Sequence, residues 1–326
     1  MIVSILDQSP VLEGSSQAKA LEESKKLALL GEELGYKRYW IAEHHDMKGL
    51  SCSSPEVMIS YIGASTKKIR LGAGAVLLPH YKPYKVAETY HMLETLFPGR
   101  IDIGIGRAPG GSAEASMALS GNYLDNVKKF PDLLDELLHF LRNDFPEDHL
   151  YSSLKASPVP PSKPQPWLLG TNNKSALLAA EHKLPYVFGH FMSDADANEC
   201  INTYKTNNTA KPYVILTVAV ICGETTEEAE EMALSYWLWK EKMEKGEKLQ
   251  GVPSIMKAKE YFSGRADKRS EGRENEKVII GSPEEAGKKI SELQQQVKAD
   301  EIMVVTITPT YEMRSNSYKA IAKALL

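Results

Sequence analysis

The chain has 326 residues, of which 42% are hydrophobic and 25% are charged, and its formal net charge is −4. This composition permits a large buried core and excludes wholesale disorder, and the slightly negative charge provides no basic surface for nucleic acid. No apolar run reaches the roughly 18 residues that span a bilayer, and no secretion signal opens the sequence. We therefore expect a cytoplasmic protein with neither nucleic-acid nor membrane partners.

Short apolar runs alternate with helical patterns along most of the chain. In chain order, eight strands are expected at residues 2–6, 38–42, 69–78, 101–105, 167–169, 186–188, 213–221 and 302–307. Apolar residues recur with helical spacing at 86–97 and 134–141, and another helical pattern covers 283–297. This alternation predicts βαβ units on a parallel sheet.

Eight strands favour a closed (β/α)8 TIM barrel over an open doubly wound sheet. The glycines after the fourth strand do not complete a dinucleotide-binding GxGxxG fingerprint, because Pro109 stands where the third glycine belongs. No domain boundary is evident, so residues 1–326 are interpreted as a single domain. Between the seventh and eighth strands, 19 of the 38 residues from 240 to 277 are charged. This indicates a charged helical insertion at about 240–280, either a solvated surface segment or a lid over the active-site face.

Histidines cluster at the expected C-terminal ends of the strands, where barrel enzymes carry their functional groups. Four of the eight, His44, His45, His80 and His190, lie there. Together they suggest a site for proton transfer or hydrogen bonding, although backbone partners would satisfy each one alone. Glu43 beside two histidines also resembles a metal-ligand set, but adjacent residues of an extended chain point to opposite faces. We therefore expect no metal.

The fifth strand end leads directly into a helix through Gly170, Thr171 and Asn172, with Ser175 in the first turn. Such a turn either caps its helix with side chains or binds a phosphate at the helix N-terminus. Arg107, at the neighbouring fourth strand end, could supply a charged fork to that phosphate.

The third strand has almost no side chains, because residues 72–75 are Gly, Ala, Gly and Ala. Glycine weakens a strand unless another group approaches its backbone closely. The sequence leaves two interpretations open here: tight packing of the barrel interior, or a flat ring lying against the strand.

Several segments, taken in order, make the chain similar to the bacterial luciferase-like flavin monooxygenases. They are residues 7–10 (DQSP), 39–45 (YWIAEHH), 71–81 (LGAGAVLLPHY), 98–111 (PGRIDIGIGRAPGG) and 168–170 (LLG). The resemblance covers nearly the whole chain and is weakest in the charged insertion. It implies a (β/α)8 barrel, usually a homodimer, that binds reduced FMN at the C-terminal face.

The same resemblance implies roles for individual residues. His44 takes the position of the catalytic histidine, an acid/base group near the flavin. The Gly74–Ala75 bond matches a cis peptide beneath the flavin ring. The phosphate site and the cofactor-binding turn correspond to Arg107, Gly170, Thr171, Asn172 and Ser175. The substrate side is assigned to Glu43, His45, His80 and His190.

Two positions depart from the light-emitting luciferase subunit. Gly106 stands in place of its reactive cysteine, and Thr171 stands in place of an acidic residue, so light emission from a long-chain aldehyde is not expected. The predicted function is a two-component monooxygenase in which a separate NAD(P)H-dependent flavin reductase supplies reduced FMN. With molecular oxygen, the barrel would oxidise a small organic substrate. The alternatives are a deazaflavin-dependent oxidoreductase, a metal-dependent barrel hydrolase and a non-catalytic flavin-binding subunit.

Overall fold

The computed structural model describes residues 1–247, 249–263 and 277–326. Its strands are β1 (Val3–Asp7), β2 (Arg38–Ile41), β3 (Arg70–Leu77), β4 (Ile101–Gly106), β5 (Gln165–Gly170), β6 (Tyr186–Gly189), β7 (Val214–Cys222), β8 (Val278–Gly281) and β9 (Glu301–Val305). Strands β1 to β7 pair in sequence order, and β9 pairs with both β1 and β7, so eight parallel strands close into a barrel. The predicted (β/α)8 barrel is therefore confirmed.

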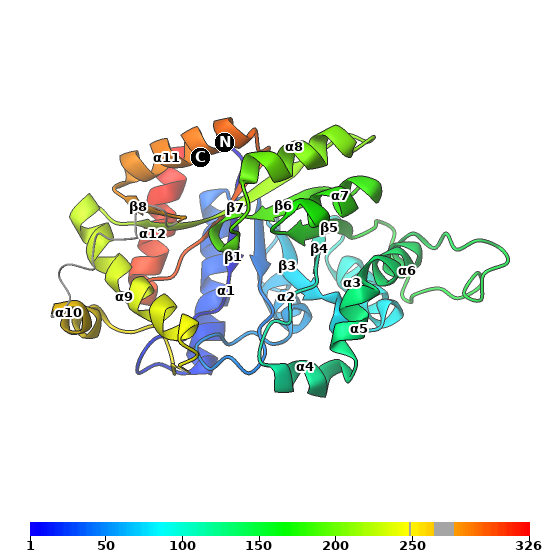
Figure 1. Ribbon diagram of the computed structural model, residues 1–326, viewed down its shortest axis with the longest axis horizontal. Helices are drawn as coiled ribbons and strands as arrows, with labels where there is room; N and C mark the ends of the chain where they lie inside the picture. The colour runs from blue at the N-terminus through cyan, green and yellow to red at the C-terminus, as the bar shows by residue number, and fades with distance from the viewer. Residues whose placement is uncertain (248, 264–276) are drawn as a thin grey trace.

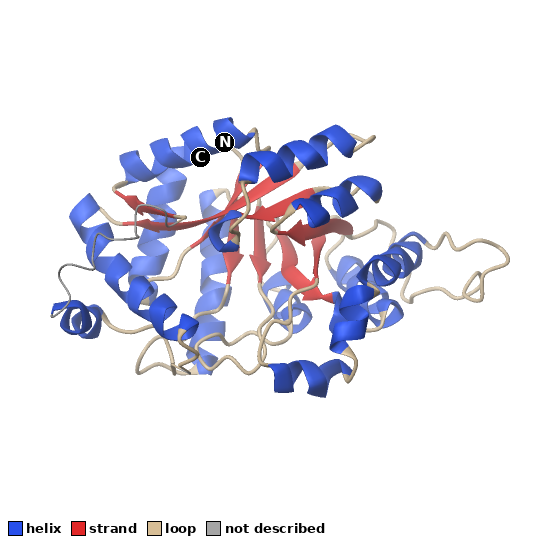
Figure 2. Cartoon of the chain, viewed as in Figure 1, coloured by secondary structure: helices blue, strands red, loops and turns tan. Residues whose placement is uncertain are grey.

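Helices cover the outside of the barrel (Figures 1 and 2). They are α1 (Gln17–Leu34), α2 (Pro55–Gly63), α3 (Pro83–Leu96), α4 (Ala113–Ser120), α5 (Tyr123–Lys128), α6 (Phe130–Arg142), α7 (Asn173–Glu181), α8 (Ala197–Asn207), α9 (Thr226–Glu244), α10 (Ile255–Ser263), α11 (Pro283–Val297) and α12 (Tyr311–Leu325), with short 3₁₀ turns η1 (Leu78–His80) and η2 (His190–Met192). The two ends of the chain lie together, where the Met1 amino group donates to the Leu325 carbonyl at 3.2 Å (Figure 1).

Helix α11 shows why local sequence alone located several of these elements. Ser282 caps its first turn, Glu285 completes the capping box, and Pro283 occupies the first helical position. The helix covers the predicted range 283–297. Its buried face, which includes Ile290 and Val297, packs toward the core.

The charged insertion contains a strand that the sequence did not reveal. Strand β8 pairs with the end of β7, from Ala219 opposite Val278 to Cys222 opposite Gly281, whereas β9 pairs with β7 only as far as Ala219. Helix α10 packs against α9. The predicted insertion is therefore not wholly helical. Residues 248 and 264–276 lie outside the described part, so the choice between a solvated segment and a lid is not resolved there.

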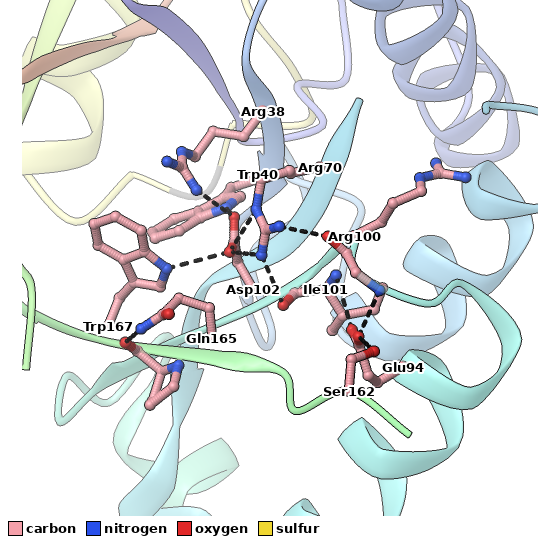
Figure 3. A network of polar contacts seen from close by, with 12 residues as sticks. Arg38, Trp40, Arg70, Glu94, Arg100, Ile101, Asp102, Ser162, Gln165 and Trp167 are labelled. Atoms are coloured by element: carbon pink, nitrogen blue, oxygen red, sulfur yellow. Dashed lines mark hydrogen bonds and ion pairs between the residues drawn. The ribbon is translucent and has the colours of Figure 1, made fainter. Parts of the chain in front are cut away.

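A buried ionic network closes the N-terminal end of the barrel (Figure 3). The Arg38 guanidinium donates to Asp102 at 2.8 Å and forms two bonds to Glu301, at 2.7 and 2.9 Å. Asp102 also accepts the indole N–H groups of Trp40 and Trp167, at 3.0 and 3.2 Å. Every one of these charges is paired and hydrogen-bonded, which is the condition under which buried charges are tolerated.

Candidate functional site

Two joined cavities lie at the C-terminal ends of the barrel strands. The first lobe has a volume of about 550 Å³, and its walls include Glu43, His44, Gly74, Ala75, Gly106, Arg107, Gly170, Thr171, Asn172, Lys174 and Ser175. The second lobe, of about 490 Å³, is described by Phe191, Asp194, Tyr236, Trp239, Lys240, Glu244, Lys277 and Ile307. Both lobes include Gln8, His44, Met47, Phe191 and Met192, so they meet at these residues.

His44 stands where the two lobes meet. Its backbone N–H donates to the Cys52 carbonyl at 2.8 Å, which fixes the chain just beyond β2. Its ring Nδ1 is buried and has no hydrogen-bond partner among the described residues. Burial, with a smaller contribution from the neighbouring His45, lowers the pKa of His44 to about 4. The ring is therefore neutral near pH 7, and its Nδ1 has no hydrogen bond to another described residue.

Glu43 lines the first lobe, but its carboxylate is engaged in holding the site together. Oε1 accepts hydrogen bonds from His45 Nε2 at 2.8 Å and from the Tyr81 hydroxyl at 2.6 Å. Oε2 accepts the Leu77 N–H at 3.2 Å. Glu43 thus ties the segment after β2 to the end of β3, and His45 points to it and does not line either lobe.

The other two strand-end histidines are also outside the two cavities. His80 Nε2 bonds the Pro109 carbonyl at 2.9 Å and the ring stacks on Tyr123 at 4.8 Å, which supports the loop after β4. His190 lies in η2, and burial together with the positive charge of Lys277 lowers its pKa to about 4. The sequence therefore brought four histidines to one end of the barrel, and the structure places only His44 on the cavity wall.

The glycines of β3 and β4 have two different uses. A Cβ at Gly72 would lie 2.6 Å from Trp40 Nε1, and one at Gly104 would lie 2.3 Å from the Ala73 carbonyl oxygen, so these two permit packing inside the barrel. Gly74 and Gly106 instead line the first lobe. The Gly74–Ala75 peptide bond is cis, as the resemblance predicts. Tight packing, one of the two interpretations left open by the sequence, therefore applies at Gly72 and Gly104, and the flat ring stays a prediction for Gly74 and Gly106.

At the far side of the first lobe, the turn before α7 is capped by its own side chains. Asn172 Oδ1 accepts the Ser175 N–H at 3.1 Å, and Ser175 Oγ donates to the Asn172 carbonyl at 2.6 Å. Gly170 is needed there, because a Cβ would lie 2.0 Å from Ser175 Oγ. The turn thus preorganises a helix N-terminus, whose positive dipole end suits an anion.

Two basic side chains line the first lobe beside this turn. Arg107 is exposed and forms no ion pair with a carboxylate of the described residues, and Lys174 belongs to the first turn of α7. With Thr171 they give this end of the lobe hydrogen-bond donors and positive charge. An anionic group here and a flat ring against Gly74 and Gly106 would fit the lobe.

Sequence reasoning missed several residues of the cavity walls. Lys174 adjoins the predicted phosphate turn, and a basic residue in the first turn of a helix was the signal that could have identified it. Gln8 follows β1 directly, within a segment already noted for its resemblance. Trp239 lies in α9 and Lys277 directly precedes β8. Both are far along the chain, and no local sequence pattern marks them as cavity residues.

Neither a metal centre nor a membrane span emerges from the described residues. Among them, no group of three or more histidine, cysteine, aspartate or glutamate side chains is placed to hold a metal ion. The Glu43 carboxylate is hydrogen-bonded to His45 and Tyr81, so it is already engaged within the protein. None of the helices described here is both long and apolar enough to cross a membrane.

Relatives of known sequence match along almost the whole chain. Two of these relatives come from Bacillus subtilis (strain 168). A protein named YceB is 40% identical over 99% of each chain, and an N-acetyl-S-alkylcysteine monooxygenase is 36% identical over 99% of this chain and 98% of its own. The solved structure of apo-MsnO8 is 32% identical and superposes with a TM-score of 0.89, covering 99% of this chain and 98% of that one.

Two more distant structures share the fold. The oxygenating constituent of 3,6-diketocamphane monooxygenase from Pseudomonas putida, solved with FMN, is 20% identical with a TM-score of 0.74, over 100% and 99% of the two chains. An F420-dependent secondary alcohol dehydrogenase is 15% identical with a TM-score of 0.72, over 100% and 99%. The family model described as luciferase-like monooxygenase matches residues 1–299, and the chain therefore belongs to the luciferase-like monooxygenase family.

Proposed function

We propose that this protein is a flavin-dependent monooxygenase that takes reduced FMN from a separate NAD(P)H-dependent reductase and oxidises a small organic substrate with molecular oxygen. The proposal rests on the residues that line the first lobe. A basic end at Arg107 and the α7 N-terminus, a side-chain-poor wall at Gly74 and Ala75, and the neutral ring of His44 all line one cavity.

The residues present fit a phosphorylated flavin. Arg107, Lys174 and Thr171 would hold the phosphate, with Asn172 and Ser175 shaping the turn beneath it. When bound and reduced, the flavin supplies the electrons that activate oxygen.

The chain's own groups have two tasks in that chemistry. His44 would hold or move a proton at its unpartnered Nδ1, between the flavin and the second lobe. The apolar side chains of the first lobe, among them Leu6, Phe130 and Leu169, would exclude water from the ring. Glu43 would act through His45 and Tyr81 as a positioning residue, while His80 and His190 would support the loops around the substrate.

Two features of the comparisons support FMN over deazaflavin. The FMN-bound distant structure and the 36% identical relative are both named monooxygenases, whereas the F420-dependent structure is named a dehydrogenase. Deazaflavin remains the second candidate, because both cofactors carry a phosphate and a flat ring that the first lobe would accommodate. We also propose that the protein is a cytoplasmic homodimer, which sedimentation of the purified chain would test.

The experiment begins with anaerobic titration of the purified protein with reduced FMN, reduced deazaflavin cofactor and riboflavin. An unrelated NADH-dependent flavin reductase is then added, and oxygen uptake is followed with a panel of small organic compounds that includes N-acetyl-S-alkylcysteines. We expect FMN binding and substrate-dependent transfer of one ¹⁸O atom from labelled O₂ into product, detected by mass spectrometry. Binding of deazaflavin alone, or flavin binding without oxygen transfer to any compound, would contradict the proposal.

A further inference from the structure

The second lobe contains a lysine, Lys277, that has no carboxylate within ion-pair distance among the described residues. Lys277, directly before β8, donates from Nζ to the carbonyls of Ser193 at 2.6 Å and Ala195 at 3.4 Å. It forms no ion pair with any carboxylate of the described residues. An ammonium has three N–H donors, so two carbonyls leave one for a ligand.

The other charged groups of this lobe are differently placed. Lys240 is half-buried, and its ammonium lies 4.0 Å from the carboxylate of Glu244, an exposed residue on the next turn of α9. Asp194 is also exposed. Lys277 is half-buried like Lys240 but has no carboxylate partner among the described residues, and a partly desolvated cation gains more from an opposite charge than one in open water.

The remaining wall of the lobe is apolar and aromatic, with Phe191, Tyr236, Trp239 and Ile307. Trp239 is only 7% exposed, and its indole Nε1–H has no hydrogen-bond partner among the described residues. This nitrogen lies close to Gly49, so the indole presents apolar surface to the lobe. The lobe thus offers a cation beside a largely apolar wall.

We propose that the second lobe selects substrates with an apolar body and a single carboxylate head, and that Lys277 is the residue that binds the head. The inference rests on the proposed function, because the lobe meets the flavin lobe at His44 and the substrate body would extend from Lys277 toward that residue. Lys277 would then determine specificity without touching the reacting atoms.

The test is direct binding to the flavin-free protein, followed by calorimetry. The probes are 4-phenylbutanoate and 4-phenylbutanamide, which match in shape and differ in charge. We expect the wild-type protein to bind the acid at least tenfold more tightly than the amide. Lys277→Gln, which retains a donor for the Ser193 carbonyl, should remove this preference, and Lys277→Arg should keep most of it.

Lys240→Gln provides the matched control, because it removes a charge from the same lobe where that charge already has Glu244 as a neighbour. We expect less than a twofold change in binding of either probe. Equal binding of acid and amide to the wild type, binding of neither, or a preference that survives Lys277→Gln would overturn the proposal. Because no flavin is present, failure of FMN to bind in the separate titration would overturn the proposed function and leave this result standing.

Discussion

The two ends of the barrel differ in whether their buried polar groups have hydrogen-bond partners. At the N-terminal end, Asp102 and Glu301 are fully buried, and both are paired with Arg38, which is itself only 4% exposed. At the C-terminal end, His44 Nδ1, His190 Nδ1 and Trp239 Nε1 are buried and have no partner among the described residues. Burying unsatisfied polar atoms costs stability, and of these three residues His44 and Trp239 line the cavities, whereas His190 lies outside them.

This contrast separates the satisfied, stabilising end of the barrel from the end that we propose to be reactive. Removing a member of the satisfied network leaves other charges stranded, whereas removing an unsatisfied atom leaves nothing unpaired. Substitutions at the two ends should therefore have opposite consequences for stability and activity. The predictions below test that separation.

The largest effect is expected from Asp102→Ala. It would leave Arg38 without one partner and the indole N–H groups of Trp40 and Trp167 without an acceptor. We expect the free energy of unfolding to fall by about 3–5 kcal/mol, measured by urea denaturation. His44→Ala is the comparison from the other end, with an expected change under about 1 kcal/mol. Similar losses of unfolding free energy in the two variants would contradict the difference between the two ends of the barrel.

The next effect concerns turnover. His44→Ala should lower the rate of substrate oxidation by about 100-fold or more, because proton transfer by a positioned group contributes that much. The dissociation constant for FMN should change less than threefold. The control is His139→Ala, a histidine on the outer helix α6 with a 38% exposed side chain. Retained turnover in the His44 variant would exclude it from the catalytic role.

A smaller effect is expected at the phosphate end. Arg107→Gln should weaken FMN binding by about tenfold, since it removes one charged contact worth roughly 1.4 kcal/mol. Riboflavin, which lacks the phosphate, should bind the variant and the wild type equally. Arg142→Gln, on the exposed end of α6, serves as the control for loss of positive charge. A parallel loss of riboflavin binding would show that Arg107 acts on the ring or the fold.

The smallest effect is a pH dependence of stability. The unfolded chain protonates His44 as the pH falls through its ordinary pKa of 6.5, whereas the folded protein resists protonation until about 4. The folded state therefore loses stability between these values and gains nothing from His44 above them, with a loss of about 1 kcal/mol at pH 5.5. Urea denaturation of His44→Gln at pH 7.5 and 5.5 should show a smaller acid loss than the wild type. An equal loss would assign the effect to other groups.

Local sequence patterns predicted the parts of the fold that depend on local physics. The spacing of Leu134, Leu137 and Leu138 defined the buried face of α6, the capping residues located the start of α7, and the helical pattern at 283–297 located α11. Strand ends in a closed barrel must converge, so every residue assigned to the cofactor site lines the first lobe. Which way each strand-end side chain turns was not predictable, because His44 and His45 are adjacent and only one reaches the cavity.

What the sequence could not supply depends on long-range pairing. Val278, Ile279 and Ile280 form a very short apolar run beside a charged stretch, and only the free edge at the end of β7 makes it a strand. Arg38 forms its ion pairs with Asp102, which is 64 positions away in the sequence, and with Glu301, which is 263 positions away. No periodicity within one segment contains that information.

The forked pairing of β7 has a consequence for how such enzymes diversify. Its first half belongs to the barrel ring and its last residues carry β8 as a side branch. Lys277 directly precedes that branch, while the first lobe is lined mainly by residues at the ends of β2 to β5 and just after them. If the two proposals hold, mutations on the branch would exchange one recognised compound for another and leave the flavin site intact, which would allow a single ancestral oxygenase to give rise to many.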